Sequence, residues 1–144
     1  MTRLIASVAL LASLAAAGCG SDTTTSPSTT TTTVATTTEL FTGTIAPRGS
    51  SFYSFPVTNS GTVSVTLVSA TTTRIGPAGS APLSVGFGVP SGFGCGVTSV
   101  IDATPGLTSQ LSASGSASGI YCINVADLAG LSGDTLFVIR IVHT

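Results

Sequence analysis

The chain has a single histidine, His143, and it lies one residue from the C-terminus. A nucleophilic triad needs a serine, a histidine and an acid, with the histidine positioned to within ~0.5 Å. Because the ends of terminal strands fray, we expect His143 to be a solvent-facing residue that closes the last strand. The sequence has no Gly-x-Ser-x-Gly elbow, phosphate-binding loop or metalloprotease helix motif. These features predict a protein that is not an enzyme and that uses no cofactor.

The acidic residues are few and widely spaced: Asp22, Glu39, Asp102, Asp127 and Asp134. Asp127 and Asp134, together with Asn124, could supply the oxygen ligands that calcium prefers. No Asp-x-Asp spacing supports such a site, and aspartates in this context commonly cap turns or pair with arginines at the surface. Turn capping is therefore our first interpretation of the aspartates, and a calcium site is the alternative.

The three cysteines are Cys19, Cys95 and Cys122. Two cysteines and one distant histidine fall short of any usual metal-ligand set, so we predict no metal site at Cys95 and Cys122. Instead we predict a disulfide between them, which closes a loop that the chain-entropy model values at about 3.6 kcal/mol. Because Cys122 is out of phase with the apolar residues beside it, we expect the bridge on the outer face of its strand or at a strand end.

Carbohydrate-binding sites usually present an exposed aromatic platform with polar groups around it. This chain has no tryptophan. Phe52 and Tyr53 are consecutive and point to opposite faces of a predicted strand, and Phe93 lies in a predicted loop. One or two exposed rings keep a carbohydrate-binding role open as an alternative.

The N-terminal residues, 1–18, have the features of a signal peptide: Arg3, an apolar stretch from Leu4 to Leu14, and small residues before Cys19. The apolar stretch is shorter than the ~20 residues that a membrane-spanning helix needs. The segment Ala16-Ala17-Gly18-Cys19 resembles the lipobox of bacterial lipoproteins, which implies acylation of Cys19. The alternative is an ordinary signal peptide cleaved after Ala17, which leaves a free thiol. Gly20 takes the place of the aspartate that resembles an inner-membrane retention signal, so we expect anchoring at the outer membrane.

The segment after the predicted signal peptide, residues 19–38, is dominated by hydroxyl-bearing residues. Ser21 to Thr38 contains 11 Thr and 3 Ser with one charge. Such a tract buries too little apolar surface to offset the entropy of ordering, so we predict a disordered linker. Charged residues make up 6% of the whole chain and the net charge is −1. This composition offers no electrostatic surface for nucleic acid.

Residues 39–144 show short alternating runs separated by Gly, Pro, Asn and Ser, which predicts an all-β antiparallel sandwich of about eight strands. We expect strands around Phe41–Thr44, Tyr53–Val57, Val63–Leu67, Leu83–Val89, Val97–Ile101, Leu107–Leu111, Ile120–Val125 and Thr135–His143. The last run is nearly all apolar, so we expect a central strand that is covered on both faces.

Several segments of the predicted domain resemble the bacterial pre-peptidase C-terminal (PPC) domain. They are Phe41-Thr42-Gly43, Ser54-Phe55-Pro56-Val57, Gly61 to Leu67, Gly119-Ile120-Tyr121-Cys122, Asp127, and Phe137 to His143. The resemblance implies a jelly-roll sandwich that acts beside a secreted enzyme, although this chain carries no peptidase. Together with the lipobox, it predicts a lipid-anchored cell-envelope module for interaction or accessory roles. The expected partners are the membrane, through the anchor, and a protein or glycan at the cell surface.

Overall fold

Alternating apolar and polar residues produce eight β-strands in the computed structural model, which describes residues 33–72 and 82–144. The strands are β1 (Thr37–Ile45), β2 (Ser50–Val57), β3 (Gly61–Thr72), β4 (Leu83–Ser91), β5 (Gly94–Ala103), β6 (Leu111–Gly115), β7 (Gly119–Asp127) and β8 (Thr135–His143). None of the described residues forms a helix that could cross a membrane. The predicted signal peptide, Cys19 and most of the predicted linker lie outside the described residues. The first strand begins two residues before the predicted domain boundary at Glu39.

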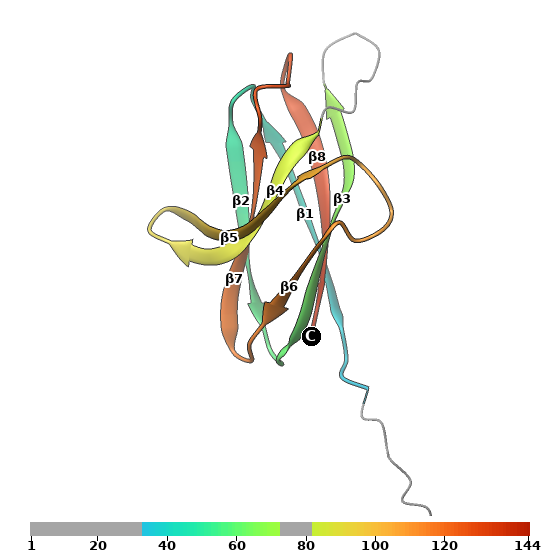
Figure 1. Cartoon of the computed structure of the whole chain (residues 1–144), viewed down its shortest axis with the longest axis vertical. Coiled ribbons are helices and arrows are strands. Elements are labelled where there is room, and N and C mark those ends of the chain that lie inside the picture. The colour runs from blue at the N-terminus through green and yellow to red at the C-terminus, as the bar shows by residue number, and fades with distance from the viewer. Residues whose placement is uncertain (1–32, 73–81) are drawn as a thin grey trace, which may run out of the picture. The chain divides into compact units, whose positions relative to one another are not determined.

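The strands form two four-stranded sheets, which face each other as two layers (Figure 1). One sheet has the order β1-β8-β3-β6 and the other has the order β2-β7-β4-β5, and all pairings are antiparallel. Successive strands mostly alternate between the layers, as expected for a jelly roll built from two Greek keys. The predicted all-β sandwich is therefore confirmed.

The space between the sheets is filled by inward-facing side chains from every second position of the strands. Aromatic rings run through this core in contact with one another. Phe137 meets Phe41 edge to face at 4.9 Å, and Phe41 stacks on Tyr53 at 5.4 Å. The contacts continue through Phe55 and reach Phe87, which stacks on Tyr121. The Phe41–Tyr53 contact thus links the two sheets, and the other ring contacts lie within one sheet or the other.

The predicted strand Leu107–Leu111 is wrong in its position. The strand begins only at Leu111, as β6, and residues 104–110 form a loop that runs along the edge of β3 before β6 starts. The Gly106 N–H donates to the Leu67 carbonyl at 2.9 Å, and the Gln110 side chain accepts from the Leu67 N–H at 2.7 Å. The loop satisfies the free backbone groups of β3, and Leu107 is left exposed.

Strand β8 lies in the middle of its sheet between β1 and β3, as predicted. However, only one of its faces is buried. Phe137, Ile139 and Ile141 point into the core, whereas Leu136 on the other face is 52% exposed. The prediction of two covered faces is wrong because the sandwich has only two layers, so the outer face of each sheet meets solvent.

Candidate functional site

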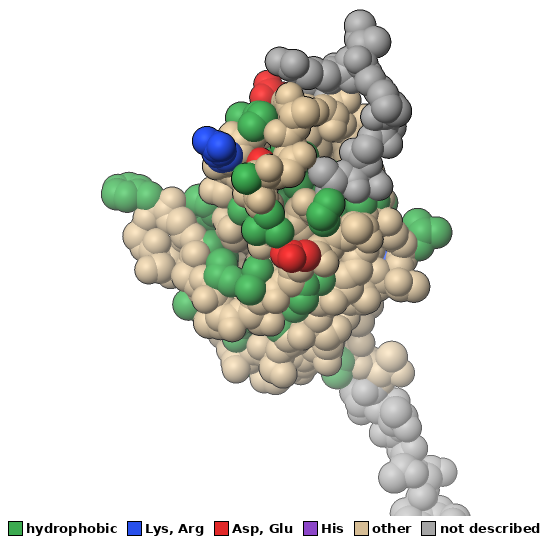
Figure 2. All heavy atoms as spheres, turned by 45° about the horizontal axis from the view of Figure 1, so that its top comes forward, with side chains coloured by type: hydrophobic (Ala, Val, Ile, Leu, Met, Phe, Trp, Pro, Cys, Tyr) green, Lys and Arg blue, Asp and Glu red, His purple; other side chains and the backbone are tan. Residues whose placement is uncertain are grey.

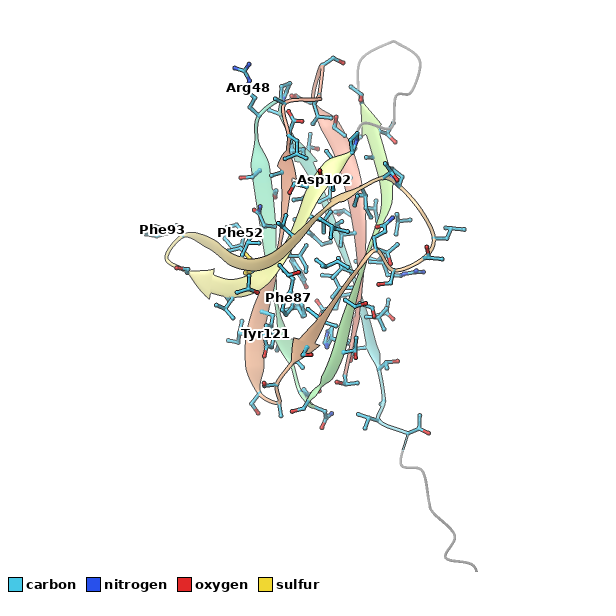
Figure 3. The ribbon with its side chains drawn as sticks, viewed as in Figure 1. Arg48, Phe52, Phe87, Phe93, Asp102 and Tyr121 are labelled. Carbon is cyan, nitrogen blue, oxygen red and sulfur yellow. A yellow bond between two sulfur atoms is a disulfide. The ribbon has the colours of Figure 1, made fainter. Side chains whose placement is uncertain are left out.

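The β4–β5 hairpin extends beyond the body of the domain (Figure 1). Strand β4 pairs with β7 only as far as Gly88, and the rest of the hairpin, Val89–Val97, continues past that point. Its turn carries Phe93, whose side chain is 104% exposed, and this ring points away from the protein (Figure 3). The apex of the hairpin is therefore an apolar ring without a covering group.

Two close contacts at glycines hold the base of this hairpin. A Cβ atom on Gly88 would lie 2.0 Å from the Gly96 carbonyl oxygen. Any residue other than glycine at position 88 would therefore force β4 and β5 apart. A Cβ atom on Gly86 would lie 2.8 Å from Val97 Cγ1, so the Val97 side chain fills the space above that glycine. Glycine at these two positions lets β5 fold tightly onto β4.

The disulfide between Cys95 and Cys122 joins the hairpin to β7, as the sequence predicts. The Cα atoms are 5.8 Å apart. Cys122 is fully buried although it lies out of phase with the core residues Ile123 and Val125, so the bridge covers the outer face of β7. The cross-link therefore restricts the hairpin from the solvent side of the sheet.

The outer face of the β2-β7-β4-β5 sheet carries a row of residues in direct register. Phe52 pairs with Asn124, Asn124 with Gly86, and Gly86 with Val100. Phe52 is 43% exposed and Val100 is 59% exposed. Val97 lies over Gly86 in this row, and Ile120 is exposed on the same face of β7, four residues before Asn124. We refer to Phe52, Val97, Val100 and Ile120 as the apolar face.

Exposed apolar side chains are concentrated on this sheet. Of the 11 large hydrophobic residues that are exposed in the described part of the chain, six belong to this sheet or its hairpin, and Leu40 and Leu136 belong to the other sheet. The four strands contain only two charged residues, Asp102 and Asp127. Figure 2 shows a surface of mainly uncharged groups, with few acidic or basic side chains. The sheet thus offers contact area with little charge.

A partly buried polar cluster lies where β1, β2 and β8 meet. His143 is only 3% exposed, and its Nε2 donates to Glu39 Oε1 at 3.0 Å. The Tyr53 hydroxyl donates to the other oxygen of the same carboxylate, and the Phe55 ring packs against the imidazole at 5.1 Å. The expectation of a solvent-facing His143 is therefore wrong. The residue is buried because its strand pairs with β1 up to Thr37, so the imidazole lies inside the sandwich.

The chemistry of this cluster is structural. The hydrogen bond to Glu39 raises the pKa of Tyr53, and burial and the negative charge of Glu39 act in the same direction. His143 Nδ1 has no hydrogen-bond partner among the described residues. The imidazole is buried against the Phe55 ring, which shields it from solvent. The cluster connects β1 with β2, which are the first strands of the two sheets.

Asp127 caps the turn that follows β7, as our first interpretation of it predicts. Its Oδ2 accepts the Arg48 N–H at 2.7 Å, and its Oδ1 accepts the N–H groups of Gly130 and Leu131 at 2.9 and 3.1 Å. The bond from Arg48 is the main cause of a lowered Asp127 pKa, and the bonds from the turn add to it. The carboxylate therefore fixes two adjacent loops.

The alternative sites remain predictions. No three His, Cys, Asp or Glu side chains come close enough to hold a metal ion in residues 33–72 and 82–144. A calcium site at Asn124, Asp127 and Asp134 would have to compete with the backbone groups that Asp127 already accepts. Phe52 and Tyr53 do point to opposite faces, with Phe52 outward beside Asn124. One exposed ring next to an amide is the arrangement that a carbohydrate site would use.

Comparisons with known proteins add the following. No protein-family model matches the chain, and no curated protein is significantly similar to it in sequence. In structure, the chain is similar to the crystal structure of Aeromonas hydrophila PliG, a periplasmic lysozyme inhibitor of g-type lysozyme. The TM-score is 0.47 and the sequence identity is 15%, over 74% of this chain and 84% of that chain. The inhibitory activity named there is a property of the Aeromonas protein.

Proposed function

We propose that this protein is a non-catalytic, lipid-anchored module of the cell envelope that binds another protein through the apolar face. Acylation of Cys19 provides the anchor, at the outer membrane. The observation that carries the proposal is the concentration of exposed apolar residues on one sheet and its hairpin, six against two on the other sheet. Contiguous apolar patches on soluble domains commonly mark interaction sites.

The chemistry of the apolar face indicates the kind of partner. Val97 and Val100 are β-branched and Phe52 is aromatic, so they present shape and apolar area with little freedom to lose on binding. Fixed charges are scarce on this sheet, so steering by long-range electrostatics contributes little. A complementary partner surface is therefore apolar in its centre and weakly charged. The resemblance to PPC domains suggests that such a partner is a secreted enzyme.

Site-specific photo-crosslinking in cells tests the proposal. A photoreactive residue replaces Val100 on the apolar face, and a matched control replaces Leu136, which is 52% exposed on the outer face of the other sheet. We expect a discrete protein adduct from position 100 and none from position 136. Equal labelling at both positions, or no adduct at either, would overturn the proposal. The intact mass of the same chain measures acylation of Cys19.

The second candidate is a carbohydrate-binding or calcium-binding module. The carbohydrate form is favoured by the exposed Phe52 ring beside Asn124. A glycan array probed with the mature chain and with Phe52→Ala tests the first form, since only the parent chain is expected to retain glycans. Calorimetric titration with calcium, compared with Asp134→Asn, tests the second form.

A further inference from the structure

The apex of the β4–β5 hairpin has features that the apolar face does not share. Phe93 is exposed on all sides, since its neighbours Gly92 and Gly94 carry no side chain to shield the ring. Gly92 has φ +57°, which suits glycine and sets the tight turn at the apex. Fixing such a ring at the end of a cross-linked hairpin gives no contact within the domain. The arrangement is suited to insertion into an apolar medium.

Charge is absent from the outer part of the hairpin. The residues from Val89 to Val97 include no acidic or basic side chain, and Val89 and Val97 are 47% and 41% exposed. The apex therefore has an exposed ring at its end and no charge behind it. An interface of lipid headgroups and acyl chains accepts such a wedge without a complementary pocket, and it does not require positive charge.

The length of chain before β1 determines what the hairpin can reach. Thr37 lies 18 residues after Cys19, which limits the distance between them to ~60 Å. The longest strand, β3, has 12 residues and a length of ~40 Å. A bilayer that holds an acylated Cys19 is therefore within reach of the hairpin apex. Because anchoring confines the domain to this layer, a weak contact becomes an intramolecular one.

We propose that Phe93 and the β4–β5 hairpin insert into the surface of the bilayer that anchors the chain. This inference rests on the lipid anchor of the proposed function. Burial of one phenylalanine favours association by roughly 10- to 150-fold, which is too little to hold a free domain but enough to orient an anchored one. Insertion of the hairpin then sets the orientation of the apolar face relative to the bilayer.

Tryptophan fluorescence provides the test, because the chain contains no tryptophan. Phe93→Trp is made in the mature acylated chain in phosphatidylcholine vesicles whose acyl chains carry bromine, which quenches tryptophan. Leu136→Trp, on the outer face of the other sheet, is the matched control. We expect a blue shift and loss of emission for position 93 and no change for position 136. We expect the same quenching when phosphatidylglycerol is included in the vesicles.

The outcomes separate the inference from the proposed function. Unshifted, unquenched emission at position 93 in the acylated chain would overturn the insertion, whatever adduct Val100 forms in cells. Quenching that requires phosphatidylglycerol would also overturn it, since it would show an electrostatic contact. In the Cys19→Ser variant we expect at least tenfold less quenching, and full quenching there would contradict the role of the anchor. If cells do not acylate the chain, coupling the Cys19 thiol to a maleimide phospholipid leaves the insertion testable.

Discussion

Breaking the Cys95–Cys122 bridge is expected to cost a large part of the stability of the domain. The two cysteines are 27 residues apart in sequence, so the bond closes a loop of 28 residues. The chain-entropy model assigns such a loop about 3.6 kcal/mol at 25 °C, through restriction of the unfolded state. Domains of this size have a total margin of ~5 to 15 kcal/mol, so the reduced protein is expected to remain folded but close to its limit.

Urea denaturation of three forms separates the contributions. Oxidised and reduced wild-type protein differ only in the cross-link. We expect their free energies of unfolding to differ by about 3.6 kcal/mol, and their Tm values in thermal denaturation to differ by roughly 15 °C. The variant C95A/C122A also lacks the buried sulfur of Cys122, and we expect it to lose about a further 1 kcal/mol.

Hydrogen exchange locates the effect in the structure. The bridge is the covalent link between the hairpin and β7, so amides from Ser91 to Gly96 are expected to exchange faster in the reduced protein. A difference below about 1 kcal/mol between oxidised and reduced protein would refute the entropic reasoning. Unchanged exchange in the hairpin would refute the claim that the bridge holds it in place.

Three further predictions concern the tyrosines, a carboxylate and a glycine. Alkaline ultraviolet titration of the two tyrosines should show two steps, because the Ser116 N–H lowers the pKa of Tyr121 and the Glu39 carboxylate raises the pKa of Tyr53. The Tyr53→Phe variant should lack the upper step. Because the Tyr53 pKa is raised on folding, the free energy of unfolding should fall as the pH rises above about 10 and through the Tyr53 pKa. The pKa of Asp127 is lowered on folding, so its contribution to stability is present above the unfolded pKa near 4 and is lost as the pH falls through the folded pKa. In the Asp127→Asn variant, the free energy of unfolding should therefore depend less on pH in the acidic range. Gly88→Ala should lower the free energy of unfolding by about 1 to 3 kcal/mol in urea denaturation. Gly130→Ala, with open space around that position, should lower it by less than about 0.5 kcal/mol. Equal effects of the two substitutions would contradict the close contact between β4 and β5 at Gly88.

Much of the fold could be predicted from alternation along the chain. In β7, Tyr121, Ile123 and Val125 point inward as their spacing indicates, and the position of Cys122 between them placed the disulfide on the outer face. Alternation identifies which residues share a face, so it is informative wherever one face is buried. It failed at Leu107, where a single apolar residue in a loop resembled the start of a strand.

The buried cluster could not be predicted, because it depends on register between distant strands. His143 and Glu39 are 104 residues apart, and they meet only because β1 and β8 pair along their full length. Nothing in the local sequence shows that the last strand residue is covered by the Phe55 ring of the opposite sheet. A charged residue directly after a Thr-rich tract, in a chain with so few charges, is the one available signal that Glu39 has a structural role.

The apolar face was missed for a related reason. Ile120 and Val100 occupy positions in their strands that alternation assigns to solvent, where a serine or threonine would be ordinary. Their significance becomes visible only when the sheet order places β2, β7, β4 and β5 side by side, with Val97 filling the space above Gly86. Sequence spacing identifies an outward residue, but it does not show that several outward residues form one surface.

The scarcity of charge connects these features to one another. A domain with few ionised groups gains little from electrostatic steering, so its encounters with partners are slow unless they are already close. A lipid anchor would supply that proximity, and the cross-linked hairpin would supply orientation by insertion of Phe93. In this arrangement the anchor and the hairpin provide the proximity and orientation that long-range electrostatics would otherwise provide. In the proposed arrangement, a hydroxyl-rich exterior would limit unspecific contacts and leave the apolar face available for a specific one.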